Sequence, residues 1–122
     1  MGVLTTMNPT GTIDPQALAG LRDLSPDEPA FLRDLIDLFV SDVAERLLEL
    51  ERALASADTQ VLTRAAHTIK GSCSNFGAAE LMRISQIMEQ QGKASDVAGA
   101  AATLPALKVE YAAVSEALQK FR

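Results

Sequence analysis

The only histidine of the chain, His67, is the residue best placed to do chemistry. Its surroundings have a helical pattern, and at about 100° per residue Lys70 and Gly71 fall on the helix face that carries the imidazole. Ser74 falls on the same strip, as does Arg64 one turn before the histidine. A neutral imidazole can attack an electrophile through a ring nitrogen, and an ammonium group can pair with an anion. The pattern therefore predicts an accessible nucleophile beside a cation.

Three features distinguish His67 from an ordinary surface histidine. Lys70 supplies a cation one turn along the same face. Gly71 stands in the middle of a helix, where glycine costs about 1 kcal/mol relative to alanine, and it leaves the surface beside the imidazole open to another protein. The segment 59–79 contains two cations and no Asp or Glu, in a chain of net charge −5. We therefore expect surroundings that tolerate an anion.

The composition excludes several other kinds of site. A single histidine cannot form the His pairs of common zinc sites or a di-iron centre in a bundle, and we expect neither a metal nor a cofactor. The single cysteine, Cys73, lies on the core side of the predicted helix, which excludes a Cys–His dyad with His67. The chain has no glycine-rich phosphate loop. We therefore predict a carrier that receives its group from elsewhere, without ATP-dependent kinase activity of its own.

Length and composition describe the molecule that must position these residues. With 122 residues, 48% of them hydrophobic and 22% charged, the chain is expected to form one domain without disulfides. The net charge of −5 argues against nucleic-acid binding, which needs a basic surface. The chain has no apolar run that could span a bilayer and no secretory signal pattern. We expect a cytoplasmic monomer that does not contact a membrane.

The N-terminal third predicts a flexible segment followed by two helices. Residues 1–12 show no periodicity and are expected to form a flexible lead-in. Asp14 can cap a short helix that ends at about Leu24. Ser25 and Glu28 form a capping box that predicts the start of a helix about 30 residues long. Apolar residues at gaps of three and four, Leu38 among them, give this helix one buried stripe.

Three further helices are predicted in the rest of the chain. Asp58 opens the helix that carries the histidine. The next helix covers about 78–91, and Gly92 is expected to end it. The last segment is expected to begin at about Asp96 and to kink at Pro105.

These elements predict an all-α fold. The chain shows neither alternating hydrophobicity nor an Asn-Gly or Asp-Gly hairpin dipeptide, so no strand signal competes with the helices. We expect an antiparallel four-helix bundle over residues 13–122, with the short N-terminal helix capping one end.

The run from His67 to Ala78, HTIKGSCSNFGA, closely resembles the signature of histidine-containing phosphotransfer (HPt) domains. The family pattern is His, any residue, Leu, Lys, Gly, Ser, Ser, two variable positions, Leu, Gly and Ala. Ile69, Cys73 and Phe76 depart from this pattern, and each is a mild replacement. The short first helix, the long acidic helix and the Pro-interrupted last helix also fit the family.

The resemblance implies a phosphorelay intermediate of two-component signalling. His67 would be the phosphoacceptor, Lys70 would stabilise the phosphoryl group, and Gly71 would give a response-regulator receiver domain room to dock. The partners implied are receiver domains, which bring their own Mg²⁺, and a hybrid sensor histidine kinase. Arg64, Ser74 and Gln86 are possible neighbours from helix phase alone.

Two alternatives remain open on the sequence. The chain could be a phosphoaccepting domain cut from a larger hybrid or chemotaxis-type histidine kinase. It could also be a helical adaptor that has kept the bundle without the chemistry, although the intact His67, Lys70 and Gly71 argue against this.

Overall fold

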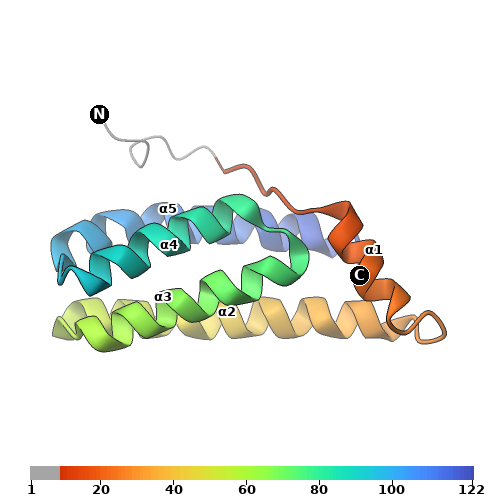
Figure 1. The fold of residues 1–122 in the computed structure, drawn as a ribbon, viewed down its shortest axis with the longest axis horizontal. Coiled ribbons are helices and arrows are strands. Elements are labelled where there is room, and N and C mark those ends of the chain that lie inside the picture. Colours follow the sequence, from red (N-terminus) through yellow and green to blue (C-terminus); the bar gives the residue numbers. More distant parts are fainter. Residues whose placement is uncertain (1–8) are drawn as a thin grey trace.

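A computed structural model describes residues 9–122 and confirms the all-α prediction. The elements in chain order are α1 (Pro15–Asp23), α2 (Ala30–Ser56), α3 (Thr59–Cys73), the 3-10 turn η2 (Ser74–Phe76), α4 (Ala79–Lys93) and α5 (Val97–Gln119). The long helices α2 to α5 lie side by side as an antiparallel bundle, and α1 packs across the end where the chain also finishes (Figure 1). No helix within residues 9–122 is both long and apolar enough to cross a membrane.

Aspartate caps start three of the helices. The side chains of Asp14, Asp58 and Asp96 each accept a hydrogen bond of 2.9 to 3.1 Å from a backbone N–H two or three residues further on. These contacts satisfy amide groups that the first turn of a helix leaves without partners. The predicted starts of α1, α3 and α5 are therefore confirmed.

The predicted start of the second helix is wrong by four residues. Ser25 lies in a bend, residues 26 and 27 form a turn, and α2 begins at Ala30 after Pro29. A helix begun at Ser25 would place Pro29 where the first intrahelical N–H is needed, and proline has none. Pro29 therefore prevents the helix start that the capping box at Ser25 and Glu28 predicts.

The predicted end of the fourth helix is also wrong. Gly92 is buried inside α4, which continues to Lys93. The chain reverses instead at Ser95, whose φ of +57° is in the left-handed region. Gly92 therefore does not end the helix.

The core fills the space between the four long helices. Each helix contributes residues from one stripe, as predicted, but Leu38 is 67% exposed and lies outside that core. Pro105 lies within α5, as expected, on the exposed side of the helix. Tyr111 in α5 donates a hydrogen bond of 2.7 Å to the carbonyl of Val40 in α2. This contact ties the first long helix to the last.

The expected lead-in 1–12 falls mostly outside the described residues, which begin at residue 9. The described part is attached to the bundle: Thr10 and Gly11 donate three hydrogen bonds of 2.8 to 2.9 Å to the carboxylate of Glu110 in α5. The Asp14 amide then donates to the carbonyl of Phe76 at 2.9 Å. These contacts hold residues 10–14 first against α5 and then against the η2 turn that follows α3, directly before α1 begins.

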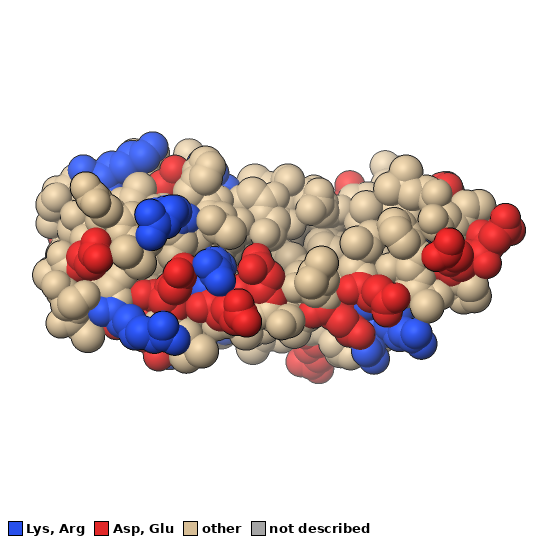
Figure 2. Space-filling view, turned by 90° about the horizontal axis from the view of Figure 1, so that it is seen from below, with Lys and Arg blue, Asp and Glu red and all other residues tan. Residues whose placement is uncertain are grey.

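One face of the bundle carries many acidic side chains, with Lys and Arg among them. Figure 2 shows Asp and Glu along much of the length of the face seen from below in Figure 1. On α2, Arg46 lies 3.0 to 3.7 Å from the carboxylates of Asp42, Glu45 and Glu49. Arg46 thus lies among three acids.

Candidate functional site

The imidazole of His67 is exposed at one edge and held at the other. His67 lies in the middle of α3, and 65% of its side chain is accessible to solvent. Its Nδ1 atom is 2.9 Å from Oε2 of Glu89 in α4. Among residues 9–122, Nε2 makes no hydrogen bond. The two ring nitrogens therefore have different surroundings.

Glu89 is the centre of a small charge cluster. Its side chain is only 4% exposed, although its α4 neighbours Gln90 and Lys93 face solvent. The Lys70 ammonium lies 2.6 Å from Oε1 as an ion pair without hydrogen-bond geometry, and Lys93 Nζ lies 3.5 Å from Oε2. One buried carboxylate is thus shared by two ammonium groups and the imidazole.

The charge state of Glu89 follows from these contacts. The Lys70 ammonium lowers the pKa of this carboxyl, burial opposes that effect, and the contact with His67 adds to it, so that the pKa falls from 4.5 to about 2. At neutral pH the group is an ionised carboxylate, which can only accept hydrogen bonds. The proton between the two side chains therefore belongs to Nδ1 of His67. In the neutral ring this leaves the lone pair on the exposed Nε2.

A shallow groove beside the imidazole contains further polar groups. It is lined by the ends of α3 and α4, and Arg64 and Lys93 lie on it together with His67. Arg64 is exposed, so the expected neighbour from the preceding turn does share the site. Cations thus border the groove into which His67 projects.

The other two predicted neighbours, Ser74 and Gln86, do not line the groove that contains His67. Ser74 donates a 2.8 Å hydrogen bond to the Gly71 carbonyl, so its hydroxyl closes the end of α3. Gln86 lies on a different groove of α4, together with Arg83 and Gln90. A Cβ atom built on Gly71 would meet nothing within 4 Å, which leaves the helix surface one turn beyond His67 open.

Cys73 lies in the core, as the sequence predicts. It is fully buried and unpaired, and burial raises the pKa of its thiol to about 12. A thiol that stays protonated at neutral pH is a poor nucleophile. Cys73 is therefore a packing residue of the hydrophobic core.

Sequence reasoning missed Glu89, because this acid comes from another helix than the acid-free segment 59–79. Residues 59–79 lack acids, but α4 places a carboxylate against the imidazole from 22 positions further along the chain. One signal was present: Glu89 falls on the same strip of α4 as Ser85 and Gly92, which are buried. An acid on the inward face of a predicted amphipathic helix marks either a misassigned face or a paired charge.

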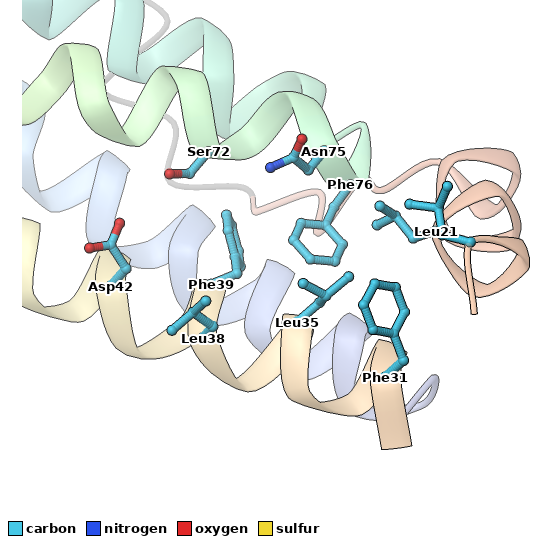
Figure 3. Close-up of a pocket in the computed structure, with 10 residues that line it drawn as sticks. Leu21, Phe31, Leu35, Leu38, Phe39, Asp42, Ser72, Asn75 and Phe76 are labelled. Carbon is cyan, nitrogen blue, oxygen red and sulfur yellow. The ribbon is translucent and has the colours of Figure 1, made fainter. Parts of the chain in front are cut away.

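An apolar groove opens at the end of α3 that follows Gly71. Side chains of α1, α2 and η2 converge on it, and the exposed Leu38 lies on its edge (Figure 3). Phe39 and Phe76 pack with ring centroids 4.9 Å apart. Ser72, the neighbour of Gly71, contributes a polar edge. The groove thus leaves the apolar side chains of Leu24 and Leu38 exposed near the end of the helix that carries His67.

A comparison with known protein families decides the relationship. The model of the Hpt domain matches residues 34–117, most of the bundle. The chain belongs to the Hpt domain family. The matched segment includes His67, Lys70, Gly71 and Glu89.

Curated relatives of this Hpt domain are phosphorelay proteins. The chain is 31% identical over 102 residues to the phosphorelay intermediate protein rdeA of Dictyostelium discoideum, covering 84% of this chain and 40% of the relative. It is 24% identical over 89 residues to the phosphorelay intermediate protein YPD1 of Candida albicans, covering 73% and 48%. The chain thus spans less than half the length of these relatives.

A solved structure has the same fold. Histidine-containing phosphotransfer protein B (HptB) from Pseudomonas aeruginosa PAO1 superposes with a TM-score of 0.81 at 32% identity. The superposition covers 88% of this chain and 91% of that one. The predicted fold class is therefore confirmed by a solved relative as well as by the helices themselves.

Proposed function

We propose that this Hpt domain is a phosphorelay intermediate that takes a phosphoryl group onto Nε2 of His67 from a receiver-domain aspartate and passes it to a second receiver. The observation that carries the proposal is the contact between Nδ1 and the ionised Glu89. It keeps the proton on the inner nitrogen and leaves the exposed nitrogen as the nucleophile.

The transfer balances without a further reactant. The Nε2 lone pair attacks phosphorus, an N–P bond forms, and the bond between phosphorus and the aspartyl oxygen breaks to release a carboxylate. The ring gains positive character while Nδ1 keeps its proton, and the Glu89 carboxylate at 2.9 Å stabilises that charge. Transfer to the second receiver is the same reaction in reverse.

Lys70 and Gly71 would act on the exposed side of the ring. The Lys70 ammonium is shared with Glu89 in the resting protein and is 28% exposed, so it can also pair with phosphoryl oxygens. The open surface at Gly71 lets the receiver approach the imidazole closely. The apolar groove of Figure 3, which adjoins Gly71 through Ser72, offers the receiver a second area of contact.

The protein would act as a carrier in the cytoplasm. The receivers, and a hybrid sensor histidine kinase upstream of them, bring the Mg²⁺ and the ATP-dependent chemistry. The free thiol of Cys73 fits a reducing compartment. The long helices bury their apolar stripes within one chain, so a monomer suffices, and residues 13–122 would form the functional domain.

The proposal is tested by labelling with a phosphorylated receiver from the same organism. One phosphoryl group per chain should appear, in a form that mild acid removes and base does not, as for a phosphoramidate. His67→Gln should abolish the label and leave the helical circular dichroism unchanged. A label that persists in His67→Gln, or one that forms from ATP alone, contradicts the proposal.

A further inference from the structure

The helices that carry His67 and Glu89 are in close contact at a glycine. The antiparallel α3 and α4 share the most extensive contact of any pair of helices in the bundle. Gly92 of α4 is buried against Thr63 of α3. A Cβ atom on Gly92 would overlap the Thr63 hydroxyl oxygen and lie 3.1 Å from both the Thr63 Cα and N atoms. The contact therefore exists only because residue 92 has no side chain.

Thr63 cannot easily make room for such an atom. Its hydroxyl donates a 2.7 Å hydrogen bond to the carbonyl of Thr59, which fixes the side chain against its own helix. The two atoms at 3.1 Å belong to the backbone and move only with α3 itself. A side chain at position 92 therefore pushes the two helices apart.

The close contact lies one turn from the reacting pair. Thr63 precedes His67 by four residues and Gly92 follows Glu89 by three, so in antiparallel helices the two pairs are neighbours along the same seam. Among residues 9–122, the one hydrogen bond that joins the imidazole to α4 runs between Nδ1 and Oε2 of Glu89, at 2.9 Å. A hydrogen bond of this length weakens steeply when its atoms separate.

We propose that Gly92, through its contact with Thr63, is a positioning residue that sets which nitrogen of His67 carries the proton. The close approach holds Glu89 against Nδ1 and so leaves the lone pair on Nε2. The inference deepens the proposed function, because it assigns to α4 the control of the nucleophile. Its first test nevertheless needs no phosphotransfer.

The tautomer of His67 can be read directly by ¹⁵N NMR of the imidazole ring. The chain has one histidine, so one pair of ring nitrogen signals reports the site. At about pH 8.5, alkaline to the usual titration range of histidine, the wild-type protein should show a protonated Nδ1 and an unprotonated Nε2. Gly92→Ala should give a mixture in which Nε2 carries a substantial share of the proton.

A second glycine supplies the matched control. A Cβ atom on Gly20 in α1 would meet nothing within 4 Å, so Gly20→Ala adds the same methyl group without moving a helix. Its ring signals should match those of the wild type. Wild-type ring signals in a folded Gly92→Ala protein overturn the inference.

Reversal of the effect tests the route through Thr63. Thr63→Ala removes the overlapping oxygen but leaves the two backbone atoms at 3.1 Å, so Thr63→Ala/Gly92→Ala should return the ring signals only part of the way toward those of the wild type. If Gly92→Ala alone does not fold, the double variant takes its place as the test protein, because its Cβ at position 92 still meets the Thr63 backbone at 3.1 Å. In that case Thr63→Ala alone is the reference, and identical ring signals in the two proteins contradict the inference.

Labelling with the small donor phosphoramidate extends the test to reactivity. This donor needs no docking surface, and ammonia leaves as the N–P bond to the ring forms. Gly92→Ala should be labelled about tenfold more slowly, because a misplacement of about 1 Å near reacting groups is costly. A shifted tautomer with unchanged labelling shows that the tautomer does not control the nucleophile. A shifted tautomer in a protein that no donor labels leaves the positioning intact and contradicts the proposed function.

Discussion

Two buried glutamates differ in what surrounds them. Glu89 and Glu110 are 3% and 2% exposed. Glu110 accepts three hydrogen bonds, all from the backbone and hydroxyl groups of Thr10 and Gly11. Glu89 instead contacts ionisable side chains of α3 and α4, including an imidazole that is 65% exposed. The two carboxylates are therefore equally buried but have partners of different kinds.

The comparison shows what makes a buried carboxylate functional. Glu110 is held by groups that carry no net charge and cannot titrate, so it fixes the chain before α1 in place. Glu89 is held by groups that face solvent and that can change partners or charge. Because His67 reaches out of the protein, the charge of Glu89 acts on the surface where a substrate would bind. Burial alone does not distinguish a structural acid from one that supports chemistry.

The largest expected effect comes from removing each glutamate in turn. Glu89→Ala should slow labelling by phosphoramidate about tenfold to a hundredfold, since a hydrogen bond to a charged group contributes roughly 1.5 to 3 kcal/mol. Glu110→Ala should change that rate less than twofold and lower the melting temperature instead. Single-turnover labelling and thermal melts on the same preparations separate the two outcomes.

An intermediate substitution sharpens the same test. The amide oxygen of Glu89→Gln can still accept from Nδ1 but carries no charge, so this variant should fall between Glu89→Ala and the wild type. If Glu89→Ala and Glu110→Ala slow labelling equally, the two carboxylates share one structural purpose and the comparison fails.

A smaller effect is expected on the outer side of the imidazole. Gly71→Gln places a side chain on the open surface where the receiver would dock. Transfer from a receiver should slow about tenfold, because docking is displaced by about 1 Å or more, whereas labelling by phosphoramidate should keep its wild-type rate. The melting temperature should be kept or raised, since glycine is a poor helix former.

Comparison of the two phosphoryl donors, the receiver and phosphoramidate, also defines the results that would contradict this prediction for Gly71→Gln. If Gly71→Gln slows both reactions equally, the glycine supports the imidazole itself and not the docking of a partner. If it unfolds the protein, the space found beside Gly71 does not exist in solution.

The smallest effect concerns stability in acid. The pKa of Glu89 is lowered to about 2 in the folded protein, against 4.5 for an ordinary glutamate, so its ionised form stabilises the fold. That contribution is complete above about pH 4.5 and is lost as the pH falls toward 2. The unfolding free energy of Glu89→Gln should therefore decrease less over this window than that of the wild type.

Urea unfolding at several pH values measures this difference. Asp37 beside Arg122 and Glu80 beside Arg83 also have lowered pKa values, but both proteins contain these pairs, so their effect cancels. Parallel curves for the wild type and Glu89→Gln would show that the cluster around Glu89 does not stabilise the fold.

Sequence reasoning succeeded where one helix contains all the information. His67, Lys70 and Gly71 lie within two turns of α3, so helical periodicity alone places them on one face. The aspartate caps of α1, α3 and α5 are equally local. The failure at Pro29 is local as well, because two start signals competed within five residues and the later one prevailed.

The rest of the site depends on how two helices are aligned. Glu89 reaches His67 only because α3 and α4 pack in one particular register, and Gly92 fits only against Thr63. Periodicity gives the inward face of each helix but not the longitudinal position of one helix against another. Gly92 was therefore interpreted from its local chemistry as a helix end, although its absent side chain serves a contact between helices.

The most direct test is to locate the phosphoryl group on the ring. The protein is labelled with ¹⁵N, phosphorylated by its receiver, and studied by NMR for coupling between phosphorus and a ring nitrogen of His67. Coupling to Nε2, with a proton still on Nδ1 beside Glu89, is the expected result. Coupling to Nδ1, or a phosphoryl group on a serine or threonine, would contradict the account.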